Sequence, residues 1–225
     1  MRKDKDPRKK DYIPSSLDFG PVMFYIARHF GFCYGVENAI EIAYKAIDEN
    51  PGKRIFLLSE MIHNPQVNKD LIDRGVMFMM DTNGKQHISW DNLNKSDVII
   101  LPAFGTTLEI EDKISSIGLD TFKYNTTCPF VERVWKMSSK LGSGDYTIII
   151  HGKHYHEESR ATASQVGKYP NGRYIIVRDL KEVKIICDYI TGKKGSLSKA
   201  EFTRHFSQKA TKGFDPERDL KKIGV

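Results

Sequence analysis

Short β-rich runs alternate with segments of helical period along this chain from about residue 22 onward. Strands are predicted at residues 22–27, 54–58, 76–80, 98–101, 121–123, 146–151 and 173–177. Two of the segments between them carry apolar residues at helical spacing, namely Val36, Ala39, Ile40, Ala43, Ile47, Val131, Val134, Trp135 and Leu141. Because such alternation folds into parallel sheets joined by right-handed helical crossovers, we predict an α/β protein.

The pattern C-x-x-V-E occurs at residues 33–37 and again at 128–132. Each copy follows a predicted strand and opens a predicted helix, and Pro129 suits the first helical position. The repeat predicts two three-layer α/β units with parallel sheets, at 22–127 and 128–225, after a basic tail at 1–21.

The second of these units is predicted to be incomplete. Residues 191–199 read TGKKGSLSK, which is typical of a linker, and a short helix is expected at 200–210. The apolar segment at 221–225 then reads as the opening of a strand. We interpret the chain as a fragment of a longer protein.

The composition predicts a globular protein that stays in the cytoplasm. The sequence is 40% hydrophobic and 28% charged, with a mean hydropathy of −0.45, and no apolar run approaches the roughly 20 residues of a membrane helix. The net charge of +6 falls to +2 (29 basic against 27 acidic) without the first ten residues, so we expect no nucleic-acid partner. Without a signal-peptide core, the three cysteines are expected to be reduced.

Two cysteines stand just before predicted helix starts, at the sheet edge where parallel sheets bind ligands. Backbone N–H groups there favour the thiolate, so Cys33 and Cys128 are candidate metal ligands, with an inert thiol as the alternative for either one. Cys187 shares helical spacing with Val183, Ile186 and Ile190, and we predict that it lies in the core.

Histidines mark further loops at the same edge. His63 precedes Asn64 and a proline at a predicted helix start, which suits an anion site, although simple packing on the loop fits equally well. The run at 151–158 holds three histidines and two carboxylates. Its spacing matches no standard zinc signature, so we favour one histidine that orients a ligand and one carboxylate that moves protons over a zinc site.

Taken together, six motifs resemble the 4-hydroxy-3-methylbut-2-enyl diphosphate reductase family. They are HFGFCYGVENAI (29–40), SEMIHNPQVN (59–68), LPAFGTT (101–107), NTTCPFVERVW (125–135), HGKHYHEESRAT (151–162) and KGFDPERDL (212–220). The last two, with PAFG, are similar to the longer branch of plants and cyanobacteria. The resemblance implies a pseudo-threefold trefoil of three α/β units around a 4Fe-4S cluster, of which this chain would hold two.

The resemblance implies that two cysteines bind the 4Fe-4S cluster. Cys33 and Cys128 match the first two cluster ligands, whereas the third ligand has no counterpart in these residues. Phe104 stands where many members have a further histidine. Thr106 or Thr107 is therefore expected to contribute a hydroxyl to substrate binding.

The resemblance also implies a reaction, the last reductive step of the non-mevalonate isoprenoid route. His63 and His156 match the histidines that hold the diphosphate and the hydroxyl side of the substrate, and Glu158 matches the proton-relay carboxylate. Electrons from ferredoxin or flavodoxin would expel the hydroxyl as water and give isopentenyl or dimethylallyl diphosphate. A cluster-less α/β module that binds diphosphate without reducing it is the alternative, and a zinc hydrolase is a third interpretation.

Overall fold

The computed structural model of the chain describes residues 13–27 and 31–225. These residues form two compact units, one within Met1–Tyr34 and one at Gly35–Val225. The predicted units 22–127 and 128–225 each contribute one sheet to the larger unit, so both sheets belong to one compact body. None of the helices in the described residues is long and apolar enough to cross a membrane.

The smaller unit is an antiparallel hairpin of β1 (Ser15–Asp18) and β2 (Met23–Ile26). The carboxylate of Asp18 accepts from the N–H of Gly20 at 2.8 Å, and the φ of +83° at Gly20 suits a tight turn. The predicted strand at 22–27 exists, but the parallel pairing implied for it is wrong, because this turn folds β1 back onto β2. The strand β1 lies within the segment predicted to be a basic tail.

The first parallel sheet has the strand order β4-β3-β5. It comprises β3 (Ile55–Leu57), β4 (Val76–Phe78) and β5 (Val98–Ile100), with helices α1 (Tyr34–Glu49), α2 (Pro65–Asp73) and α3 (Leu108–Ile117) and the 3-10 turn η1 (Trp90–Asn92). The strands predicted at 54–58, 76–80 and 98–101 are confirmed. Their apolar residues suit a sheet that is buried on both faces.

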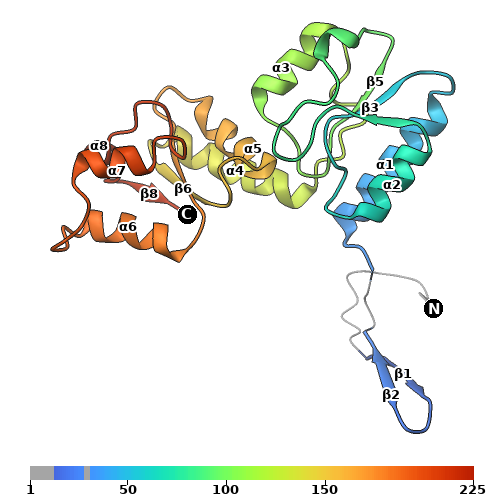
Figure 1. Cartoon of the computed structure of the whole chain (residues 1–225), viewed down its shortest axis with the longest axis horizontal. Coiled ribbons are helices and arrows are strands. Elements are labelled where there is room, and N and C mark those ends of the chain that lie inside the picture. The colour runs from blue at the N-terminus through green and yellow to red at the C-terminus, as the bar shows by residue number, and fades with distance from the viewer. Residues whose placement is uncertain (1–12, 28–30) are drawn as a thin grey trace. The chain divides into compact units, whose positions relative to one another are not determined.

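Alternate residues of β3 pack on opposite faces of this sheet. Leu57 packs in a core with Ala39 and Ala43 of α1, whereas Phe56 packs with Ile114 of α3. Figure 1 shows α1 and α2 together on one side of β3. The small alanines allow a close approach of α1 to the sheet.

Residues 121–123 form a turn, so the strand predicted there is wrong. The carboxylate of Asp120 accepts from the N–H groups of Phe122, at 2.8 Å, and of Lys123, at 3.2 Å. The side chain of Phe122 is 86% exposed. Because an aspartate can satisfy the next backbone donors in this way, the segment turns without a strand neighbour.

The second parallel sheet has the strand order β7-β6-β8. It comprises β6 (Thr147–His151), β7 (Arg173–Val177) and β8 (Ile223–Gly224), with helices α4 (Pro129–Ser143), α5 (Glu157–Gly167), α6 (Leu180–Ile190), α7 (Lys199–His205) and α8 (Pro216–Asp219). The predicted α/β class and the strands at 146–151, 173–177 and 221–225 are confirmed. The helix predicted at 200–210 ends at His205, and farther along, the carbonyl of Lys209 accepts from the N–H of Ile176 in β7 at 2.6 Å.

Cys187 is exposed on α6, so its predicted core position is wrong. Ile186 is buried, and Ile185 and Tyr189 pack against the same core, so the buried face lies on their side of the helix. Ile190, on the flank of Cys187, is 45% exposed. Helical spacing places Ile186 correctly but does not decide which flank of the helix is covered.

The two sheets meet where the β5–α3 loop packs on α4 and α5. Gly105 of this loop has a φ of +68°, and a Cβ at this position would overlap the indole ring of Trp135 on α4. Nearby, the N–H of Leu108 donates to the hydroxyl of Ser164 on α5 at 3.3 Å. Glycine is needed at position 105 both for the backbone angle and for space.

Gly105→Ala is expected to lower the free energy of unfolding by about 3 kcal/mol, because backbone strain and overpacking each cost on the order of 1–3 kcal/mol. Gly52→Ala is the matched control, since Gly52 has a φ of +77° but nothing within 4 Å of an added Cβ. Its expected cost is about 1 kcal/mol. Urea unfolding measures both, and equal losses would contradict a role for the Trp135 contact.

Candidate functional site

Three loops at the carboxyl ends of β3, β5 and β6 bring His63, Phe104 and His156 together. The ring of His63 stacks on Phe104 with centroids 4.2 Å apart, and His156 meets His63 edge-on at 5.1 Å. Loops and helix N-termini gather at this edge of a parallel sheet. The two histidines, which were predicted from separate motifs, therefore form one cluster with contributions from both sheets.

The loop that carries His63 is held by two asparagines. Asn64 caps α2 by accepting from two backbone N–H groups of the first turn, at 3.0 and 3.3 Å. The buried amide of Asn68 accepts from the N–H of Met61 at 3.0 Å and donates to the carbonyl of Ile62 at 2.9 Å. Because both ends of this loop are fixed, the half-exposed ring of His63 is presented from a rigid support.

His156 is the N-cap of α5, and its side chain is only 19% exposed. The Nδ1 atom accepts from the N–H of Glu158 at 3.4 Å and lies 3.8 Å from the Glu158 carboxylate. Burial lowers the pKa of His156, and the facing carboxylate of Glu158 opposes this effect. Since Nδ1 is an acceptor, the proton of the neutral ring lies on Nε2, which can donate to a ligand.

The predicted proton-relay residue belongs to the same cluster. One atom each from His63, His156 and Glu158 lies within 4.8 Å of the other two. The Glu158 side chain is 50% exposed, so its carboxyl can exchange protons with solvent. Two imidazoles and one carboxyl thus converge at the junction of the sheets.

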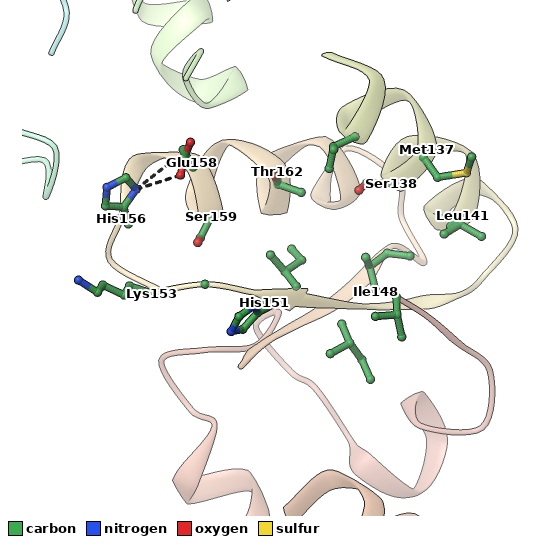
Figure 2. A pocket seen from close by; sticks show the side chains of 15 residues that line it. Met137, Ser138, Leu141, Ile148, His151, Lys153, His156, Glu158, Ser159 and Thr162 are labelled. Atoms are coloured by element: carbon green, nitrogen blue, oxygen red, sulfur yellow. Dashed lines mark hydrogen bonds and ion pairs between the residues drawn. The ribbon is translucent and has the colours of Figure 1, made fainter. Parts of the chain in front are cut away.

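A cavity of about 670 Å³ opens beside His156. Figure 2 shows Glu158, Ser159 and Thr162 of α5 on one wall and Ile148 of β6 on the opposite wall. His151, Lys153, His156, Glu158 and Ser159 lie toward one end of the cavity, whereas the other end is mostly apolar and is lined by Met137, Leu141 and Ile148 together with Ser138 (Figure 2). The cavity is therefore divided by polarity along its length.

Glu157 is a site residue that the sequence interpretation missed. Its side chain points between the sheets, where Oε2 accepts from the hydroxyl of Ser59, and Oε1 is buried without a hydrogen-bond partner among residues 13–27 and 31–225. Burial raises the pKa of Glu157 to about 8, and the Ser59 hydrogen bond opposes this shift. The sequence did hold one signal, because Glu157 stands four positions before Ala161, a small apolar residue on the same helix face, which the structure buries completely.

Thr106 and Thr107 are buried in the β5–α3 loop. They line a small space shared with Glu157 and Arg160, rather than the cavity beside His156. The structure thus places both hydroxyls near Glu157, and their predicted substrate role stays a prediction.

Cys128 caps α4 with Pro129 at the first turn. Its N–H donates to the carbonyl of Ala103 at 2.9 Å, and a Cβ at Gly35 would overlap its Sγ. Gly35 thus leaves space around this sulfur that any other residue would fill. Cys33 is an exposed free thiol in the smaller unit, so its pairing with Cys128 stays a prediction.

Comparison with a family model gives a match to the LytB protein family over residues 24–212. Two relatives, each described as 4-hydroxy-3-methylbut-2-enyl diphosphate reductase, come from a Synechococcus and a Nostoc species. The first is 39% identical over 206 residues (92% of this chain, 48% of the relative), and the second is 40% identical over 210 residues (93% and 49%). The chain spans about half the length of the curated relatives it matches.

Two solved structures resemble the fold. One is described as (E)-4-hydroxy-3-methyl-but-2-enyl diphosphate reductase, the terminal enzyme of the non-mevalonate pathway, with 27% identity, a TM-score of 0.55 and coverage of 68% of this chain and 50% of that one. The other, a reductase from Plasmodium falciparum, has 24% identity and a TM-score of 0.55, covers 68% of this chain and 44% of that one, and shows the fold alone.

Glu157 is expected to make stability fall as the pH rises. In the folded state the Glu157 carboxyl keeps its proton up to about pH 8, whereas the ordinary pKa of a glutamate is 4.5. The free energy of unfolding therefore falls as the pH rises from about 4.5 to about 8. Glu157→Gln removes this titration. Between pH 5 and 8 the free energy of unfolding of the unsubstituted chain should fall by roughly 2–4 kcal/mol more than that of Glu157→Gln. Urea unfolding at several pH values measures the difference. Glu158→Gln is the control, and parallel curves for all three proteins would contradict the assignment.

Proposed function

Because the chain belongs to the LytB protein family, we propose that it forms part of a cytoplasmic 4-hydroxy-3-methylbut-2-enyl diphosphate reductase. In this proposal His63 and His156 bind the substrate, Glu158 moves protons, and Cys33 and Cys128 bind a 4Fe-4S cluster. The observation that carries the proposal is the meeting of His63 and His156, from loops of two sheets, beside a cavity of divided polarity.

The histidine cluster has the features of an anion site. His63 directly precedes the N-cap of α2, and His156 is the N-cap of α5, so both residues lie at the positive ends of helix dipoles. Lys153 adds a cation to the cavity wall. A diphosphate would bind at this polar end, and its short hydrocarbon chain would extend toward Met137 and Ile148.

The two cysteines suit an iron–sulfur cluster by their chemistry. Both thiols are free, and Cys128 stands at the N-terminus of α4. Gly35, two positions after Cys33 in the sequence, leaves space around the Cys128 sulfur. A 4Fe-4S cluster held by three cysteines, of which Cys33 and Cys128 would be two, would supply electrons and a Lewis-acidic iron. Cys187, exposed on α6, is not part of this proposal.

The remaining chemistry falls to side chains of the histidine cluster. Replacing the substrate hydroxyl by hydrogen, with release of water, consumes two electrons and two protons. Ferredoxin or flavodoxin would supply the electrons. Nε2 of His156 would hold the substrate by donating a hydrogen bond, and the adjacent Glu158 carboxyl would deliver protons from solvent. The products would be isopentenyl and dimethylallyl diphosphate.

Anaerobic reconstitution of the chain with iron and sulfide tests whether it binds a 4Fe-4S cluster. We expect broad visible absorption that Cys33→Ala and Cys128→Ala each abolish, because each substitution removes a thiolate ligand. Cys187→Ala is the matched control and should keep the absorption. Visible absorption that survives in Cys33→Ala or in Cys128→Ala would contradict the roles proposed for these two cysteines. A colourless protein that still binds diphosphate would support the alternative, an α/β module that binds diphosphate without reducing it.

Titration calorimetry with inorganic diphosphate tests the anion site. His63→Ala and His156→Ala should each weaken binding about tenfold or more, since a hydrogen bond to a charged group contributes about 1.5–3 kcal/mol. His87→Ala removes an exposed histidine from outside the cluster and should leave the affinity unchanged. Absence of binding to the unsubstituted chain, or equal affinities in all three variants, would exclude this site.

A further inference from the structure

We infer that Glu157 is a positioning residue, which holds His156 at its observed separation from His63 through its contact with Ser59. The proposed function enters this inference only in the identity of the ligand, a diphosphate. The positioning itself concerns two histidine rings of the unliganded chain.

Glu157 joins loops that belong to different sheets. It begins α5 directly after His156, while Ser59 follows β3, four residues before His63. The hydroxyl of Ser59 donates to Oε2 of Glu157, and the N–H of Glu157 donates to the carbonyl of Thr82, beyond β4, at 3.1 Å. The residue next to one histidine is therefore bound, by side chain and backbone, to the sheet that carries the other.

The surroundings of Glu157 explain how a carboxyl can make this link. Burial is the main cause of its raised pKa, and three carboxylates add to it, those of Glu158 on its own helix, Glu60 after β3 and Asp81 after β4. Arg160 lines the same small space. Among these carboxylates the neutral acid can stay beside Ser59 without charge repulsion.

The histidine spacing depends on such links, because the rings themselves constrain it weakly. His63 and His156 meet edge-on with centroids 5.1 Å apart, and such a contact between two small rings is weak. A shift of about 1 Å at a catalytic group can cost a hundredfold in rate. Leaving one partner of a buried hydrogen bond unsatisfied destabilises the folded state, so the Glu157–Ser59 bond adds a second constraint on the distance between the rings.

Proton NMR of the unliganded chain, with histidine rings labelled, tests the positioning role at pH 6.5. The nuclear Overhauser effect between the rings of His63 and His156 reports their contact. Glu157→Leu removes the acceptor and Ser59→Ala removes the donor, so both should abolish this signal and weaken diphosphate binding about tenfold. Glu157→Gln keeps an acceptor and should restore both. Tyr124→Phe, which removes a buried hydroxyl that hydrogen-bonds Asn50 and Glu49, controls for general loss of stability.

Each outcome decides the inference. Loss of the ring contact in Glu157→Leu and Ser59→Ala, with recovery in Glu157→Gln, supports it. An unchanged ring contact in Ser59→Ala and in a folded Glu157→Leu protein overturns it, and so does an equal loss in Tyr124→Phe. If Glu157→Leu fails to fold, Ser59→Ala decides alone. If the unsubstituted chain binds no diphosphate while the ring contact responds as expected, the proposed function fails and the positioning role stands.

Discussion

Parallel strands end at one edge of their sheet, and this constraint decides where the chemistry of the chain can collect. His63 follows β3, Phe104 follows β5 and His156 follows β6, so their cluster requires that loops from two sheets meet. The packing of Gly105 on Trp135 brings the β5–α3 loop onto α4 at this junction. The site is therefore a property of the junction, and neither sheet forms it alone.

The parallel strands could be predicted because apolar, β-branched runs are their strongest sequence signal. The errors arose where one polar or small residue redirects the backbone. Asp120 satisfies the N–H groups of Phe122 and Lys123, which turns an apparent strand into a loop. Gly20 likewise permits the turn that pairs β2 with β1 instead of a parallel neighbour. Hydrophobic pattern alone does not reveal such local hydrogen bonds or turns.

The candidate site could be predicted where a motif places a chemically distinctive residue in a predicted loop, as for His63, His156 and Glu158. The environment of Glu157 could not be predicted in the same way. Glu157 and Glu158 are chemically identical neighbours, and their difference arises only because α5 turns one toward Ser59 and leaves the other half exposed. Which glutamate is buried depends on the packing between sheets, and that packing is absent from any local pattern.

The proposed anion site lies beside the carboxylates of Glu60 and Glu158, whose negative charge opposes the binding of an anion. Burial keeps Glu157 neutral up to about pH 8, so it adds no negative charge, and burial also lowers the pKa of His156. The ring of His156 thus carries little positive charge at neutral pH. A bound diphosphate would raise the pKa of an imidazole that it touches, so His156 would take up a proton as the ligand binds. In the proposed reaction that proton would lie beside Glu158, where the loss of water consumes protons.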